Sequence, residues 1–375
     1  MTEFTTLEVI WFILIAVLWL GYFILEGFDF GVGMLLRVVG KDDTEKRMVL
    51  HSIGPLWDGN EVWLLVAGGA TFAAFPEWYA TLFSGFYLAL FLILAALIMR
   101  GISFEFWGKN DSPGWRATWE WSLIGGSFLA SLLWGVAWAN IVNGVPINAE
   151  MMYTGNLFTL LNPYALLGGV TTVLLFLTHG ALFLSLRTTG EVEARARSLA
   201  NRFAPLSALA VTGFLVWTLV NQSRGDGIEW ISAAVAAVAV FGAVYAITAS
   251  NRNPLRAFAG TAVSIAGMFI ALFIDLFPNT MVSSTAAAFN MTLHESASTN
   301  YTLSVMTVVA VIFVPVVLAY QGWTYYVFRH RLSTEDFDDM KSPIDLIAEK
   351  TGGTPGGPSS SGPASAGGAT DGPKA

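Results

Sequence analysis

Long apolar runs recur along this chain, separated by short polar segments. A helix rises about 1.5 Å per residue, so about 20 apolar residues cross a hydrocarbon core about 30 Å thick. The pattern therefore predicts an all-α membrane protein with nine transmembrane helices. Their expected ranges are 8–36, 56–75, 79–99, 120–141, 162–187, 203–221, 229–249, 258–277 and 303–328.

The distribution of basic residues predicts how these spans are oriented. Lysine and arginine collect in cytoplasmic loops. All but one of the 19 lysines and arginines follow an odd-numbered predicted span, and the exception is Arg224. An even number of spans would break this alternation. We therefore expect the N-terminus outside and the C-terminus in the cytoplasm.

The expected domain organisation has three parts. The nine helices form one transmembrane domain over residues 1–332, and a cytoplasmic segment follows at 333–350. Residues 351–375 are mostly glycine, serine, proline and alanine. Such a composition cannot bury enough apolar surface to order itself, which predicts a disordered tail.

Composition narrows the possible functions. Charged residues make up 12% of the chain, against about 25% in soluble domains. The net charge of −8 gives no indication of nucleic-acid binding. The chain has no cysteine, which excludes disulfides, thiolate metal sites and thiol catalysis.

Ionisable residues gather near the cytoplasmic ends of the first four predicted spans. Glu26 and Asp29 are three residues apart, as are Asp58 and Glu61, so each pair shares a helix face. A charge in lipid is costly, which makes such residues functional candidates. The whole set is Glu26, Asp29, Asp58, Glu61, Arg100, Glu105 and Glu120.

Two interpretations of this set stay open. Neighbouring carboxylates in a low-dielectric bundle share protons, which suits a proton relay from the cytoplasm. In the structural alternative, Arg100 neutralises one carboxylate, Glu120 caps the fourth span, and the others contact water in the loops.

The four histidines do not indicate a haem or metal site. Haem ligation in a bundle uses inward-facing side chains, usually His or Met. Only His179 lies within a predicted span. No His-x-x-His or Glu-x-x-His spacing occurs either. We expect no haem axial ligand and no metal ligand from this chain.

Specific sequence strings resemble subunit II of cytochrome bd oxidases. They include EGFDFGVGM at 26–34, GPLWDGNEVW at 54–63, AGGA at 67–70, SGFY at 84–87, GNLF at 155–158, LNP at 161–163 and VMTV at 305–308. The resemblance covers about residues 8–330. It is weaker between the sixth and eighth predicted spans, and the family often has a proline before the serines at 283–284.

The resemblance implies roles for individual residues. It places a proton-route acid at Asp58 beside Trp57, and an oxygen-route aromatic residue at Trp63. Glu26 and Asp29 match the acidic pair of the first helix, with Glu26 displaced by one position from the family's usual acid. Arg100 and Glu120 match charged positions near the subunit interface. It implies no catalytic residue and no haem ligand in this chain.

The resemblance also implies cofactors and partners. A homologous subunit I carries two haems b and one haem d, oxidises quinol and reduces oxygen to water in the bacterial cytoplasmic membrane. A quinone bound in subunit II and small single-helix accessory subunits are further expectations. Two other functions stay open on the residues alone, an ion-coupled secondary transporter and an assembly scaffold without a proton role.

Overall fold

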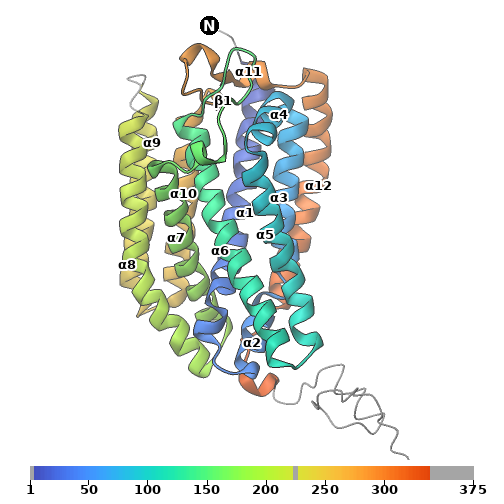
Figure 1. Cartoon of the computed structure of the whole chain (residues 1–375), viewed down its shortest axis with the longest axis vertical. Helices are drawn as coiled ribbons and strands as arrows, with labels where there is room; N and C mark the ends of the chain where they lie inside the picture. The colour runs from blue at the N-terminus through green and yellow to red at the C-terminus, as the bar shows by residue number, and fades with distance from the viewer. Residues whose placement is uncertain (1–3, 223–226, 338–375) are drawn as a thin grey trace, which may run out of the picture.

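The computed structural model describes residues 4–222 and 227–337, and in that part of the chain eight helices are long and apolar enough to cross a membrane. They stand side by side in one bundle (Figure 1). The expected all-α membrane class is confirmed. The eight are α1 (Thr6–Val39), α5 (Tyr87–Phe106, continued by the 3-10 turn η1, Trp107–Lys109), α6 (Pro113–Asn143), α7 (Pro163–Arg187), α8 (Gly190–Asn221), α9 (Ile228–Ser250), α10 (Pro254–Leu276) and α12 (Asn300–Val327).

The expected second span is also a helix, α3 (Trp57–Ala74). It packs along α1 and contacts α12. It is less apolar than the other eight because Asp58, Asn60 and Glu61 lie in its first turns. Nine spans and their orientation therefore stay predictions. We call the two ends of the bundle the α2 end and the β1 end, after α2 (Asp43–Ile53) and β1 (Asn279–Met281), which lie there (Figure 1).

Three expected spans have wrong bounds, and the polar helix α2 was not expected. The fourth expected span, 120–141, begins earlier than expected, at Pro113 of α6. The segment 79–99 is broken at Phe86, where α4 (Pro76–Gly85) ends and α5 begins. A hydropathy profile does not show such a break, because the residues on both sides of it are apolar and the profile contains no information on backbone direction. Helix α8 starts at Gly190 rather than 203, since its charged first turns are helical but not apolar. The polar helix α2 (Asp43–Ile53) was missed for the same reason.

Local capping explains where several helices begin. The Thr5 hydroxyl accepts from the Glu8 amide, and the Glu8 carboxylate accepts from the Thr5 amide, a capping box that satisfies free N–H groups at the start of α1. Asn162 caps α7, and Pro163 follows it. Proline suits the first helical position, where its missing N–H costs nothing.

Helix α1 lies at the centre of the bundle and packs against α3, α6, α7 and α10. Its contact with α7 is very close. A Cβ atom on Gly31 would lie 2.0 Å from the Phe176 carbonyl oxygen, and one on Gly27 would lie 2.8 Å from the Phe176 ring. Two glycines four residues apart on one face of α1 thus allow the two helices to pack closely.

Short elements close both ends. At the β1 end, β1 (Asn279–Met281) pairs antiparallel with β2 (Met291–Thr292), near α11 (Leu293–Ser296) and the 3-10 turns η2 (Leu157–Leu160) and η3 (Ala287–Phe289). At the α2 end, the Leu332 amide donates to the Arg187 carbonyl at 2.8 Å. The turn η4 (Thr334–Asp336) follows. The rest of the segment 333–350 and the tail 351–375 lie outside the described residues.

Candidate functional site

A buried arginine lies between acids from two other helices. Arg100 of α5 is fully buried, and its Nη1 atom lies 2.5 Å from Glu26 Oε1 on α1. The same nitrogen lies 3.8 Å from Glu61 Oε2 on α3. The expectation that Arg100 neutralises a carboxylate is confirmed for Glu26. A buried charge needs such a partner, because leaving it alone in a low dielectric is costly.

Aromatic rings complete the surroundings of this guanidinium. Its central carbon lies 5.0 Å from the centroid of the Phe30 ring and 5.4 Å from that of Phe104. Phe104 in turn stacks on Trp57, with 5.1 Å between ring centroids and 18° between the planes. The cation therefore meets electron-rich ring faces where it does not meet carboxylates.

Asp29 is the third buried acid of this cluster, which we call the Arg100 cluster (Glu26, Asp29, Glu61 and Arg100). Asp29 is fully buried, and its Oδ2 atom accepts from Asn60 Nδ2 at 2.6 Å. Asn60 Oδ1 accepts from Tyr325 at 2.7 Å and from Gln321 Nε2 at 3.3 Å. Three carboxyls around one guanidinium can share protons, since like charges in a low-dielectric site do not all ionise together.

The acids expected to form a proton route become less exposed along α3 and toward Arg100. Asp58 is exposed in the first turn, and Glu61, one turn further on, is half-buried with 23% of its side chain exposed. Beyond Glu61 lies the fully buried pair of Arg100 and Glu26. The acids thus run from the surface into the bundle. Trp63 is half-buried, and its Nε1 atom donates to Gln321 Oε1 at 2.7 Å.

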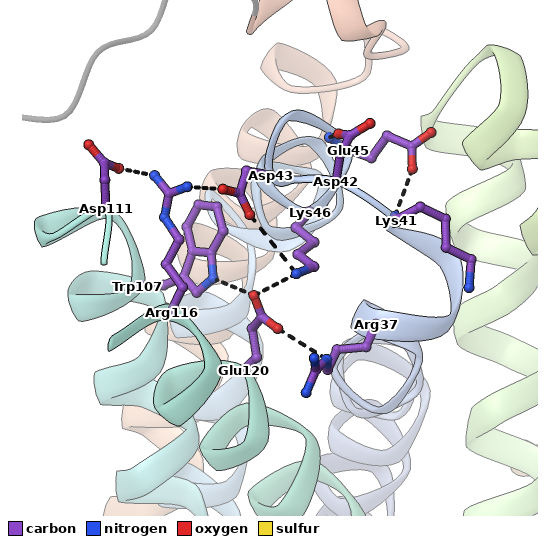
Figure 2. Close-up of polar contacts among 10 residues, drawn as sticks. All are labelled: Arg37, Lys41, Asp42, Asp43, Glu45, Lys46, Trp107, Asp111, Arg116 and Glu120. Carbon is purple, nitrogen blue, oxygen red and sulfur yellow. Dashed lines mark hydrogen bonds and ion pairs between the residues drawn. The ribbon is translucent and has the colours of Figure 1, made fainter. Parts of the chain in front are cut away.

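Glu120 belongs to a separate cluster at the α2 end, shown in Figure 2. Its buried carboxylate lies 3.2 Å from Arg37 Nε and 2.9 Å from Lys46 Nζ, and it accepts from Trp107 Nε1 at 3.2 Å. The expected capping role is wrong, because Glu120 lies well inside α6, which begins at Pro113. Glu120 instead ties α6 to the end of α1 and to α2.

Further ion pairs fasten α2 to its neighbours. Arg116 pairs with both Asp43 and Asp111 (Figure 2), and Arg195 of α8 pairs with Glu45. Burial raises the pKa of Glu45, but hydrogen bonds from Arg195 and from backbone amides outweigh it, and the pKa lies below its ordinary value. The acids expected to gather together thus divide between two clusters, and Glu105 is exposed at the end of α5.

An apolar cavity of about 490 Å³ opens among α1, α3, α4, α5 and α6. Four tryptophans line it, namely Trp19, Trp78, Trp134 and Trp138. Their spacing over three helices gave no signal in the sequence. Its size and apolar walls are those of a site for a small hydrophobic ligand.

His179 has a packing role. Its Nδ1 atom lies 2.7 Å from Thr261 Oγ1, its Nε2 atom lies 3.2 Å from the Ile24 carbonyl oxygen, and its ring stacks on Phe258. Both ring nitrogens are therefore engaged within the protein. Across residues 4–222 and 227–337, no group of three or more His, Asp or Glu could hold a metal ion.

Sequence reasoning missed Asn60, Gln321 and Tyr325. All three are polar residues inside apolar helices, where an unpaired amide is costly. The sequence contained this signal. The three residues were missed because only charged residues inside the predicted spans were considered. Their partners, however, lie 31 to 265 residues away along the chain and could not be named.

Comparisons with known proteins agree with these features. The chain matches the family described as cytochrome bd terminal oxidase subunit II over residues 7–328. It is 40% identical over 335 residues to the cytochrome bd ubiquinol oxidase subunit 2 of Bacillus subtilis, covering 88% of this chain and 98% of that protein. It is 37% identical over 372 residues to the cytochrome bd-I ubiquinol oxidase subunit 2 of Escherichia coli, covering 90% and 98%.

A solved structure shares the fold. A chain of the bd oxidase from Geobacillus thermodenitrificans superimposes with a TM-score of 0.71 over 86% of this chain and 99% of that one. The sequences are only 17% identical, so this likeness concerns the arrangement of helices.

Proposed function

Since the chain belongs to the cytochrome bd terminal oxidase subunit II family, we propose that it pairs with a haem-bearing subunit I and lines a proton route toward the oxygen-reducing haem. Quinol supplies the electrons, in keeping with the names of the relatives, and oxygen is reduced to water on the partner. The chain itself contributes no catalytic residue.

The gradient of exposure along the acids carries the proton-route proposal. Asp58 takes protons at the exposed face of α3, and Glu61 receives them one turn further in. Glu61 contacts Arg100, which contacts Glu26, so the acids are linked through one buried cation. In this proposal the α2 end faces the cytoplasm, where protons are taken up.

The same face of α3 supports docking of subunit I. Asp58 is exposed and Glu61 is half-buried on a helix that packs within a membrane bundle. Charged groups at this depth face protein or water rather than lipid. Helix α12 beside it is apolar and mostly exposed, and Leu303 is its one buried residue. Subunit I covers α3 and α12 in this proposal and shields both acids from lipid.

The haems are held by the partner, two of type b and one of type d. The cavity lined by Trp19, Trp78, Trp134 and Trp138 fits a quinone, because its walls are apolar and aromatic. A quinone there acts as a structural lipid that fills the bundle. Oxygen reaches the haems past Trp63, whose half-buried ring lies on the proposed docking face.

Two substitutions at one position test the proton route. We expect Asp58→Asn and Asp58→Ala in the assembled complex to slow oxygen consumption with quinol about tenfold or more, which is about 1.4 kcal/mol in the barrier. Glu105→Gln is the matched control, because Glu105 is an exposed acid on the neighbouring helix. Reduced-minus-oxidised spectra showing haem d establish that each variant assembles.

The outcome separates two roles for the subunit. Unchanged oxygen consumption in both Asp58 variants, with full haem content, would mean that the chain is an assembly scaffold without a proton role. Loss of haem d in the Asp58 variants but not in Glu105→Gln would likewise move Asp58 from proton transfer to assembly.

A further inference from the structure

A chain of hydrogen bonds joins α12 to the Arg100 cluster. It runs from Trp63 to Gln321, from Gln321 to Asn60, and from Asn60 to Asp29. We propose that Trp63, Gln321 and Asn60 are positioning residues that decide which oxygen of Asp29 can carry a proton. This inference rests on the proposed function and extends its proton route to Asp29, the remaining acid of the Arg100 cluster.

The indole of Trp63 fixes which group donates and which accepts in each of these hydrogen bonds. An indole N–H is a donor only, whereas an amide side chain offers a donor at one end and an acceptor at the other. Trp63 Nε1 lies 2.7 Å from the Gln321 amide, so Gln321 must present its oxygen there. The NH₂ group of Gln321 is then left for the next partner.

The donor-to-acceptor order set at Gln321 also fixes the orientation of the Asn60 amide. Gln321 Nε2 lies 3.3 Å from the side chain of Asn60, which must therefore present Oδ1 to it. Tyr325 donates its hydroxyl hydrogen to the same oxygen at 2.7 Å. If the Asn60 amide were reversed, its NH₂ group would face the NH₂ group of Gln321. Asn60 Nδ2 is thus directed at Asp29.

The last link fixes the state of the carboxyl group. Asn60 Nδ2 lies 2.6 Å from Asp29 Oδ2, so this oxygen must accept. Asp29 Oδ1 is buried and has no hydrogen-bond partner within residues 4–222 and 227–337. When Asp29 is protonated, the proton therefore sits on Oδ1, and Oδ2 is the carbonyl oxygen.

Burial keeps the Asn60 amide in this orientation. Both Asn60 and Asp29 are fully buried, so bulk water does not compete for their polar atoms and allow the amide to turn. A fixed proton-bearing oxygen matters for transfer, because the proton leaves from that oxygen when an acceptor comes within hydrogen-bond reach of it, directly or through one water. The series of hydrogen bonds from Trp63 thus leaves Asp29 Oδ1 free to exchange its proton with a neighbouring group.

Infrared difference spectra of the assembled complex between low and high pH, recorded without turnover, test this inference. Asp29→Asn identifies the C=O band of protonated Asp29 by its loss. A C=O that accepts a hydrogen bond absorbs at lower frequency than a free one. We expect Asn60→Leu to move the Asp29 band to higher frequency, because Oδ2 loses its donor.

Trp63→Phe keeps an aromatic ring and removes the fixed donor. We expect the Asp29 band to split or broaden, because both orientations of the two amides become accessible. Gln321→Met breaks the chain one step later and should do the same. Trp11→Phe is the matched control. Trp11 is a buried indole that also donates to α12, at 3.1 Å to the Leu303 carbonyl, with no amide chain behind it.

Three results would overturn the inference. One is an Asp29 band unmoved by Asn60→Leu, which would place the carbonyl at Oδ1. Another is equal broadening in Trp11→Phe and Trp63→Phe, which would indicate general loosening of α12. The third is the absence of any band that depends on Asp29. Oxygen consumption by the Asp58 variants tests the proposed function separately, because the spectra need no turnover.

Discussion

Arg100 shows how a buried charge is compensated by a single partner inside this bundle. Its guanidinium is fully buried, and the Glu26 carboxylate at 2.5 Å is its closest acid. The two side chains come from α5 and α1, so the pair joins the central helix to a peripheral one. Removing one partner from such a pair leaves an uncompensated charge, which is far more costly than removing both.

Substitutions at this pair test that reasoning. We expect Arg100→Met to lower the free energy of unfolding by about 3–5 kcal/mol, because Glu26 stays buried without its cation. The double variant Arg100→Met with Glu26→Gln should recover much of that loss. The measurement is denaturant unfolding in detergent followed by tryptophan fluorescence. Equal losses in the single and double variants would mean that the pair does not stabilise the fold.

At the scale of elements, the contact between α1 and α7 depends on glycine. Gly31 and Gly180 face each other, and a Cβ on Gly180 would lie 2.5 Å from the Gly31 carbonyl carbon. Neighbouring backbones can approach this closely only where neither residue has a side chain. Glu26 and Asp29 lie on the same turns of α1 as this contact.

Alanine substitutions separate this contact from ordinary helix propensity. We expect Gly31→Ala to lower the free energy of unfolding by about 1–3 kcal/mol, because the helices must move apart. Gly125→Ala in α6 is the control. A Cβ there meets nothing within 4 Å, and alanine favours a helix by up to about 1 kcal/mol. Similar effects of the two substitutions in thermal unfolding would contradict the close contact.

For the whole molecule, the passage of α3 through the membrane decides the orientation of every later helix. If α3 crosses, Glu77 lies outside and Lys109 inside. If it does not, the two positions exchange sides. Ion pairs at the α2 end join α1, α2, α6 and α8 there, whichever side of the membrane this end faces.

Thiol labelling tests this arrangement directly, because the chain contains no cysteine. We expect Glu77→Cys and Glu150→Cys to react with an impermeant maleimide added to intact cells. Lys109→Cys should react only after the membrane is opened. All three positions are exposed in the chain. Protection of Glu77→Cys in intact cells, together with labelling of Lys109→Cys, would contradict the expected arrangement, because either α3 does not cross or the N-terminus lies inside.

The sequence by itself determined the class of the protein, most of its helices and the family, because apolar length, basic-residue placement and short strings such as WDGN are local properties. It also singled out the buried acids Glu26, Asp29 and Glu120, although Asp58 and Glu105, singled out with them, are exposed. Only the tertiary structure decided their partners. It joined Arg100 to Glu26, moved Glu120 to a separate cluster, and placed Gln321 and Tyr325 beside Asn60. Such contacts depend on the rotation and depth of each helix, which packing across the bundle sets and hydropathy does not record.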